Sequence, residues 1–235
     1  PSRLSAKRLP GKPLLKINDL SIISHVFKRA ESANIGDVVV AAEDQEIVDD
    51  VKSNGGNAIL TSKNHKTGTD RIYEAFKLLG RNDIDLIMNI QGDEPQIDIN
   101  DIKNLDNKMK TNISKIGTLA AKISNPAMYE NENFVKVKLN EPLDQNFFPY
   151  AKNFMRKTKD TKDIFHHIGI YCYQVEVLKK FITLVQSKNE LDNKLEQMRA
   201  LDNNININVA LAKKSPIGVD TEEDYLAIKK IMEYK

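Results

Sequence analysis

The stretch 86-LIMNIQGDEP-95 begins as a continuous apolar segment and ends in a polar turn that is closed by Pro95. A short apolar run bounded by turn residues predicts a buried strand. In open α/β sheets, ligands bind beyond the carboxyl ends of the strands. Gly92 would allow a close backbone approach there, and the carboxylate of Asp93 suits Mg²⁺ beside phosphates. A simple Gly-Asp turn after a strand is the alternative explanation.

Apolar runs alternate with helical spacing around this strand. The runs 37-DVVVAA-42 and 57-NAILT-61 predict short strands, and the apolar positions in residues 20–30, 47–51 and 70–79 predict helices. Strands and helices in turn, joined by short polar segments, favour a parallel α/β sheet.

The second half of the chain is less regular. Residues 141–163 are polar and irregular. Around them, periodicity predicts strands over 113–123, 134–140, 167–173 and 205–211, and helices over about 175–186, 190–201 and from Thr221 onward. We expect one domain over residues 1–235, with an α/β fold, a mainly parallel central sheet and a β-rich insertion at roughly 124–174. We also expect a further strand before Pro1.

Composition narrows the function classes. The 235 residues include 35 Lys and Arg against 33 Asp and Glu, and a general nucleic-acid-binding protein would show a stronger basic bias. The single cysteine, Cys172, excludes an intramolecular disulfide and fits a reducing compartment. No apolar run approaches the roughly 20 residues that span a bilayer. We therefore expect a cytoplasmic protein that binds neither nucleic acid nor membrane.

Positive charge is concentrated at the start of the chain. The segment 1-PSRLSAKRLPGKPLL-15 places Arg3, Lys7, Arg8 and Lys12 around one glycine. The segment is either a disordered basic tail or a loop that holds a polyphosphate.

A second carboxylate that could share an ion with Asp93 occurs late in the chain, in 215-SPIGVDTEEDYLAIKKI-231. Thr221 and Asp224 have the spacing of a capping box that opens an amphipathic helix. Asp220 lies just outside that cap and is available for other contacts. Because Mg²⁺ is commonly held by one or two carboxylates together with substrate phosphates, Asp93 and Asp220 are a plausible pair.

Two further segments carry candidate binding residues. In 64-NHKTGTDRIYEAF-76, Thr67, Gly68 and Arg71 could meet a base or a phosphate, or could simply form a capped helix with a surface arginine. In 166-HHIGIYCYQ-174, adjacent side chains of a strand point to opposite faces, so at most one of His166 and His167 can line a given pocket, which disfavours a metal site made by the pair.

His167 and Tyr171 share one face of that strand and could bind a hydroxylated ligand. In 195-LEQMRAL-201, Glu196 and Arg199 are spaced i,i+3, which also fits a surface salt bridge.

Taken together, seven segments occur in the order found in one family. The chain resembles the 3-deoxy-manno-octulosonate cytidylyltransferases, which make the CMP-activated form of the sugar acid Kdo for lipopolysaccharide. The match covers nearly the whole chain and is poorest at about residues 124–165. The segments are 1-PSRLSAKRLPGKPL-14, 43-EDQEIVDDV-51, 65-HKTGTDR-71, 89-NIQGDEP-95, 166-HHIGIYCY-173, 195-LEQMRAL-201 and 218-GVDTEEDY-225.

This resemblance implies a Rossmann-like nucleotide-diphospho-sugar transferase fold, a homodimer and an Mg²⁺-dependent reaction of CTP with Kdo. It implies catalytic roles for Arg3, Lys12, Asp93 and Asp220, of which the two aspartates would bind the metal. It implies CTP binding by Arg3, Arg8, Lys12, Thr67, Gly68 and Arg71. The sugar-acid pocket would be lined by Gln91, His167, Tyr171, Glu196 and Gln197.

Some positions depart from the family pattern. Pro149 and Tyr150 replace a usual Ser-Arg, Phe154 and Met155 stand where Ile-Pro is usual, His166 replaces Arg or Lys, and Asn193 replaces Glu. Loss of an arginine removes a bidentate partner for a carboxylate. The substrate could therefore be a related acidic sugar such as 8-amino-Kdo or a nonulosonic acid. The chain could also be a CTP-binding homologue without turnover, and a nucleic-acid-binding module fits the sequence less well.

Overall fold

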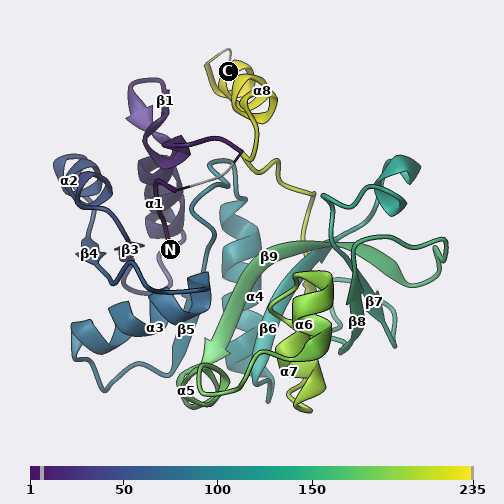
Figure 1. Ribbon diagram of the computed structural model, residues 1–235. Helices are drawn as coiled ribbons and strands as arrows, with labels where there is room; N and C mark the ends of the chain where they lie inside the picture. Colours follow the sequence, from purple (N-terminus) through teal and green to yellow (C-terminus); the bar gives the residue numbers. More distant parts are fainter. Residues whose placement is uncertain (6–7, 234–235) are drawn as a thin grey trace. The chain divides into compact units, whose positions relative to one another are not determined.

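The computed structural model describes residues 1–5 and 8–233, so Lys7 lies outside the described residues (Figure 1). Contacts divide the chain into two compact units, each built from separate stretches of sequence. The first unit consists of Pro1–Asn82, Asn89–Ile102 and Pro216–Lys235, and the second of Asp83–Met88 and Lys103–Ser215.

The first unit contains two short strand pairs with helices around them. The strands are β1 (Lys16–Ile17), β2 (Leu20–Ser21), β3 (Val40–Ala42) and β4 (Ala58–Leu60). The helices are η1 (Lys12–Leu14), α1 (Ile22–Ser32), α2 (Gln45–Ser53), α3 (Gly68–Leu79) and α8 (Glu222–Glu233). Strands β3 and β4 pair in parallel, and β1 and β2 pair antiparallel.

The core of the first unit forms where α1 and α2 meet β3. Ile23 and Phe27 lie four residues apart on α1, so they share one helix face, and they pack with Val40 of β3 and Ile47 of α2. All four side chains are buried. This packing holds β3, whose residue Ala42 forms a parallel bridge with Ser2 and so anchors the opening loop.

The second unit is built on a six-stranded sheet in the order β10-β6-β9-β7-β8, with β5 also paired to β9. Its strands are β5 (Leu86–Asn89), β6 (Ile116–Ala121), β7 (Lys136–Leu139), β8 (Ala151–Met155), β9 (Ile164–Gln174) and β10 (Ile207–Leu211). Its helices are α5 (Val175–Phe181), α6 (Lys188–Asn193), α7 (Met198–Asp202) and most of α4 (Ile99–Thr111), with η2 (Pro126–Tyr129).

The sequence prediction of an α/β fold is confirmed, but the mainly parallel pairing is wrong for this sheet. Only β10 and β6 pair in parallel among the pairs described, whereas β6–β9, β7–β9 and β7–β8 are antiparallel. Antiparallel neighbours need no crossover helix, and β8 follows β7 without one. Strand β8 was missed because only Ala151 and Phe154 of its five residues are buried.

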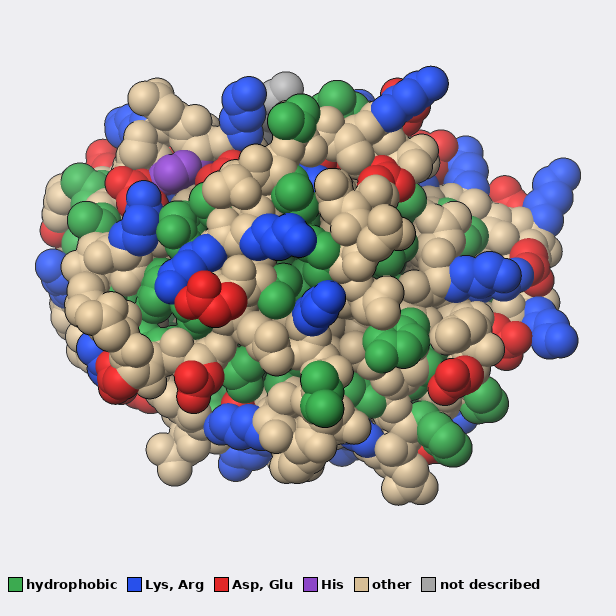
Figure 2. Space-filling model, turned by 90° about the horizontal axis from the view of Figure 1, so that it is seen from below, with side chains coloured by type: hydrophobic (Ala, Val, Ile, Leu, Met, Phe, Trp, Pro, Cys, Tyr) green, Lys and Arg blue, Asp and Glu red, His purple; other side chains and the backbone are tan. Residues whose placement is uncertain are grey.

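On the face drawn in Figure 2, Lys and Arg side chains are interspersed with Asp and Glu. Among the residues that the structure describes, no helix has both the length and the apolarity needed to cross a membrane.

Candidate active site

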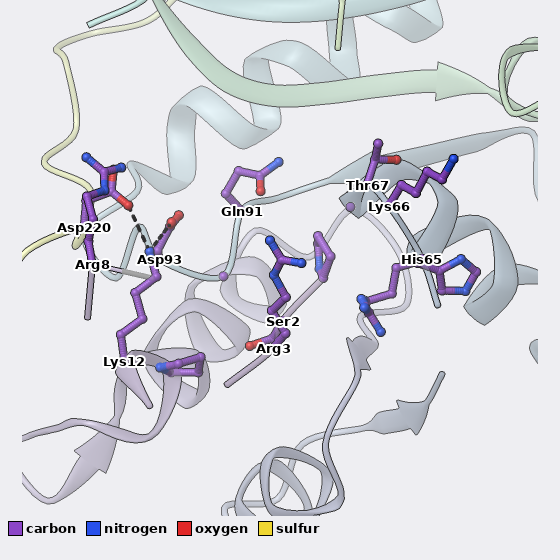
Figure 3. A pocket seen from close by; sticks show the side chains of 15 residues that line it. Ser2, Arg3, Arg8, Lys12, His65, Lys66, Thr67, Gln91, Asp93 and Asp220 are labelled. Atoms are coloured by element: carbon purple, nitrogen blue, oxygen red, sulfur yellow. Dashed lines mark hydrogen bonds and ion pairs between the residues drawn. The ribbon is translucent and has the colours of Figure 1, made fainter. Parts of the chain in front are cut away.

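A cavity of about 400 Å³ lies in the first unit (Figure 3). It is bordered by the opening loop, the start of α3, the turn after β5 and the residue that precedes the cap of α8. Nine of the residues expected to bind CTP, the sugar acid or the metal ion meet here. They are Arg3, Arg8, Lys12, Thr67, Gly68, Arg71, Gln91, Asp93 and Asp220.

Lys12 is the point at which the distant segments converge. Its Nζ donates to Oδ2 of Asp93 at 2.8 Å, to Oδ1 of Asp220 at 3.1 Å and to the carbonyl of Val219 at 2.7 Å. Burial alone would lower the pKa of Lys12, but the charges of the two aspartates raise it above the ordinary value. Gly11, with a φ of 72°, turns the loop so that Lys12 starts η1.

The neighbouring basic residues are more accessible. Arg8 pairs with Asp220 at 2.8 Å, and both side chains are about half exposed. Arg3 is exposed and lies between the Asp93 and His65 ends of the cavity in Figure 3. One end of the cavity therefore combines carboxylates with cations, as a site for a polyphosphate and a divalent ion requires.

The turn after β5 approaches the opening loop closely. A Cβ atom on Gly92 would lie 2.9 Å from the carbonyl oxygen of Pro1 and 2.9 Å from Cδ1 of Ile23, so only glycine fits.

Glu94, the residue after Asp93, was not predicted as a site residue from the sequence. Its Oε2 is buried without a hydrogen-bond partner among the described residues, and burial together with the charges of Asp93 and Asp220 raises its pKa to about 8.

Asp220 is held by the helix cap that follows it. Oδ2 of Asp224 accepts from the backbone N–H of Asp220 at 3.1 Å and from that of Thr221 at 2.9 Å, while Thr221 Oγ1 accepts from the N–H of Asp224 at 3.2 Å. The capping box expected here is confirmed, and it fixes the backbone that carries the carboxylate of Asp220.

The segment before α3 combines a helix cap with a buried arginine. Thr67 and Asp70 form a reciprocal capping box. Nη1 of Arg71 donates to Thr61 Oγ1 at 2.7 Å and to the carbonyl of Ser62 at 3.0 Å, and the guanidinium pairs with Glu43. The side chain of Arg71 is buried, so the alternative of a surface arginine is wrong. Arg71 ties the ends of β3 and β4 to the cavity wall.

Two side chains at this end of the cavity were not predicted from the sequence. His65 and Lys66 line the cavity beside Thr67. His65 forms a hydrogen bond with Glu74, whose Oε2 also accepts from the N–H of Ser62 at 2.8 Å. Only their position in the sequence next to Thr67 and Gly68 could have predicted them, since neither a histidine nor a lysine by itself indicates a nucleotide site.

The residues present fit a divalent cation only in part. Within residues 1–5 and 8–233, no three His, Cys, Asp or Glu side chains form a metal cluster. The carboxylates of Asp93 and Asp220 nevertheless point at one position, occupied here by the ammonium of Lys12. Two carboxylates and substrate phosphates together suit Mg²⁺, which usually keeps few protein ligands.

The predicted sugar-acid residues other than Gln91 belong to the second unit. Nε2 of His167 lies 3.1 Å from Thr118 Oγ1, and its ring lies 5.5 Å from that of Tyr171 and 5.0 Å from that of Phe154. The prediction that His167 and Tyr171 share one strand face is confirmed. Burial, and then the charge of His166, lowers the pKa of His167 to about 3, so its ring is neutral near pH 7.

His166 has a different environment. Its Nδ1 lies 2.8 Å from Ser215 Oγ, and its ring meets Phe134 edge-on at 5.3 Å. Burial, followed by the charge of Lys136, lowers the pKa of His166 to about 4. The separate partners of His166 and His167 agree with side chains on opposite strand faces.

The two histidines predict a loss of stability in acid. Their folded pKa values of about 4 and about 3 lie below the ordinary 6.5, so the unfolded chain binds more protons and stability rises with pH. We expect the free energy of unfolding to fall by about 1–3 kcal/mol between about pH 7.5 and about pH 5.5. Urea unfolding at both pH values measures this. A double variant, His166→Gln with His167→Gln, should flatten the slope, and an unchanged slope would contradict the assignment.

The segment with Glu196 and Gln197 is organised by a buried ion pair. Arg199 is buried and donates through Nε and Nη2 to the carboxylate of Glu190 at 2.8 and 2.6 Å. Glu196 lies 3.8 Å from the same guanidinium. The i,i+3 ion pair considered for Glu196 and Arg199 is therefore present, but it is not a surface pair, because Arg199 is buried and its main partner is Glu190. Gln197 is buried at the start of α7.

Comparison with known proteins identifies the family to which this chain belongs. A family model described as cytidylyltransferase matches residues 1–208. A 3-deoxy-manno-octulosonate cytidylyltransferase of Afipia carboxidovorans is 41% identical over 235 residues, which cover 99% of this chain and 94% of the relative. The chain belongs to the 3-deoxy-manno-octulosonate cytidylyltransferase family. A member from Thermodesulfovibrio yellowstonii is 40% identical over 244 residues, covering 99% of this chain and 96% of that protein.

Solved structures agree with this family. A CMP:2-keto-3-deoxy-manno-octonic acid synthetase complexed with CTP superposes with a TM-score of 0.89 at 32% identity, covering 99% of this chain and 96% of that one. The 4-diphosphocytidyl-2C-methyl-D-erythritol synthase of Anaerococcus prevotii shares the fold, with a TM-score of 0.64 at 13% identity and coverages of 94% and 93%. The Rossmann-like nucleotidyltransferase fold expected for the family is confirmed.

Proposed function

We propose that this protein transfers the cytidylyl group of CTP to the sugar acid Kdo, giving CMP-Kdo and pyrophosphate for lipopolysaccharide synthesis. The observation that carries the proposal is the ammonium of Lys12 held between the carboxylates of Asp93 and Asp220 in one cavity. The relatives of the chain that are named for this reaction support it.

In the proposed reaction, the opening loop binds the triphosphate. Arg3, Arg8 and Lys12 would contact phosphate oxygens, because they are the cations at the carboxylate end of the cavity or next to it. Phosphoryl transfer depends mainly on positioning and on neutralising charge, which these side chains supply without a covalent intermediate. Thr67, Gly68 and Arg71 would form the wall for the nucleoside.

Asp93 and Asp220 would hold an Mg²⁺ ion, which supplies positive charge to the phosphate oxygens when it is bound. Their carboxylates already share one cationic partner, so they lie close enough to share another. Lys12 would then bind a phosphate oxygen in place of a carboxylate.

The sugar acid would be oriented by Gln91, His167, Tyr171, Glu196 and Gln197. Its anomeric hydroxyl oxygen attacks the α-phosphorus of CTP, and the bond from that phosphorus to the bridging oxygen of pyrophosphate breaks. The hydroxyl proton passes to solvent. Since the ring of His167 is neutral near pH 7, it can accept or donate a hydrogen bond to a sugar hydroxyl.

The direct test mixes the protein with CTP, Mg²⁺ and Kdo and follows pyrophosphate release together with CMP-Kdo by mass spectrometry. We expect release that depends on all three components, and weak or no release when Mg²⁺ is chelated. No product from Kdo or from any other acid sugar would overturn the proposal.

A related acid sugar is the second candidate substrate. Phe154, one of the positions that depart from the family pattern, packs edge-on against His167 at 5.0 Å, so the departure reaches a predicted sugar-binding residue. A panel of Kdo, 8-amino-Kdo and nonulosonic acids separates the candidates by kcat/KM. Thermal stabilisation by CTP with no product from the whole panel would instead indicate a CTP-binding homologue without turnover.

Three further features are proposed from the family resemblance. We infer that residues 1–235 form a single nucleotidyltransferase domain, that two copies associate as a homodimer, and that the protein works in the cytoplasm with CTP and an acidic sugar as its substrates. Light scattering of the purified protein measures the mass and tests the dimer.

A further inference from the structure

A lysine is buried in the second unit without access to solvent. Lys136, on β7, has a relative exposure of 0%. Its Nζ donates to the carbonyl of Asn131 at 2.7 Å and to that of Arg156 at 2.5 Å. A buried cation is costly unless hydrogen bonds compensate for the lost water. Lys136 therefore ties the turn before β7 to the end of β8.

Arg156, the residue whose carbonyl Lys136 holds, directs its own side chain to three other carbonyls. Nη1 donates to Glu132 at 3.1 Å, Nε to Asn193 at 2.8 Å and Nη2 to Lys194 at 2.9 Å. The planar guanidinium presents its donors in a fixed fork, so these contacts define one arrangement of the segments. Arg156 thus connects the turn before β7 with the junction between α6 and α7.

The backbone at the junction between α6 and α7 needs hydrogen-bond partners from outside the helix. Helix α6 ends at Asn193, and the last carbonyls of a helix lack partners within it. Lys194 has a φ of 54° and a ψ of 47°, a left-handed conformation that is unfavourable for a non-glycine residue. Arg156 donates to both of these residues. Glu196 and Gln197 lie two and three residues after Lys194, directly before α7.

We propose that Arg156, whose carbonyl is held by Lys136, is a positioning residue. It holds the turn at Lys194 and thereby orients Glu196 and Gln197 toward the sugar acid. This inference rests on the proposed function and adds to it a residue outside the predicted pocket. It differs from a direct contact with substrate, because each nitrogen of Arg156 donates to a backbone carbonyl of the chain.

The test compares Arg156→Ala and Arg156→Lys with Lys152→Met, an exposed lysine on the same strand β8. For Arg156→Ala we expect the KM for Kdo to rise about tenfold, while the KM for CTP stays within about twofold. Arg156→Lys keeps the charge but loses the fork, so its KM for Kdo should fall between wild type and alanine. Lys152→Met should leave both values unchanged.

Hydrogen exchange measured by mass spectrometry supplies a readout that needs no substrate. We expect the amides of residues 193–197 to exchange about tenfold faster in Arg156→Ala, with exchange in β6 unchanged. Equal rises in both KM values, or unchanged exchange at 193–197, would overturn the inference. If the wild-type protein turns over no sugar acid, the proposed function fails, and exchange at 193–197 alone decides the role of Arg156.

Discussion

A Lys12→Met enzyme is expected to lose about a hundred- to a thousandfold of its kcat/KM for CTP. Lys12 is the only described residue whose cation touches both Asp93 and Asp220. Methionine has a similar length and no charge, so the substitution removes the cation and leaves two carboxylates facing each other. The triphosphate then loses one of the charges that neutralise it. Steady-state kinetics with varied CTP measure the loss.

The control for this experiment is Lys28→Met, because Lys28 is an exposed lysine of α1 in the same unit. It should leave kcat/KM unchanged. A Lys12→Met protein that keeps more than about a third of wild-type kcat/KM would show that Lys12 does not bind the triphosphate. Lys12→Arg keeps the charge but replaces a point-like ammonium with a planar fork, and we expect only partial activity.

The largest effect on stability is expected for Arg199→Met, which should lower the free energy of unfolding by about 3–5 kcal/mol. Glu190 and Arg199 are both almost completely buried. Burial would raise the pKa of Glu190, but hydrogen bonds from Arg199 and Gln186 hold it below its ordinary value. Without Arg199, a buried carboxylate remains with too few partners. Arg199 also covers the ring of Phe181 at 4.7 Å, and that contact weakens as well.

Urea unfolding compares Arg199→Met with Lys179→Met, which breaks the exposed pair with Glu176. The exposed pair should cost no more than about 1 kcal/mol. A double variant, Glu190→Gln with Arg199→Met, removes the stranded charge and should recover part of the loss. Similar losses for Arg199→Met and Lys179→Met would contradict the role assigned to the buried pair.

The general character of the fold was predictable because periodicity reports burial. Strands β3 and β4 and helices α1 and α3 follow apolar spacing, and the structure has them where the spacing predicts them. Strand β8 was not predictable in this way, since its two buried residues, Ala151 and Phe154, lie three positions apart and do not follow the alternation of a strand, and its pairing with β7 provides the structure. The helix predicted over 190–201 is divided at Lys194, where a non-glycine residue takes a left-handed conformation that no sequence rule anticipates.

Most residues that line the cavity could be predicted from the sequence, but the ion pairs and hydrogen bonds that hold them could not. The pairing of Asp93 with Asp220 followed from the way ligand sites form at strand ends, and both now contact Lys12. The burial of Arg71 did not follow, because its partner Glu43 is distant in sequence and lies at the end of another strand. Glu94 was also missed, since its environment depends on two carboxylates brought near by the fold.

Segments 208 residues apart in the sequence meet at Lys12, and this sets an order of events during synthesis on the ribosome. Lys12 and Asp93 are translated before Asp220 and before Asp224, which fixes the backbone of Asp220. A growing chain can form β3, β4 and their helices while the ammonium of Lys12 still lacks its second carboxylate. The proposed site for the metal ion and the triphosphate is therefore complete only after Asp220 and Asp224 have been translated, and a chain released before that point would lack one of its two carboxylates.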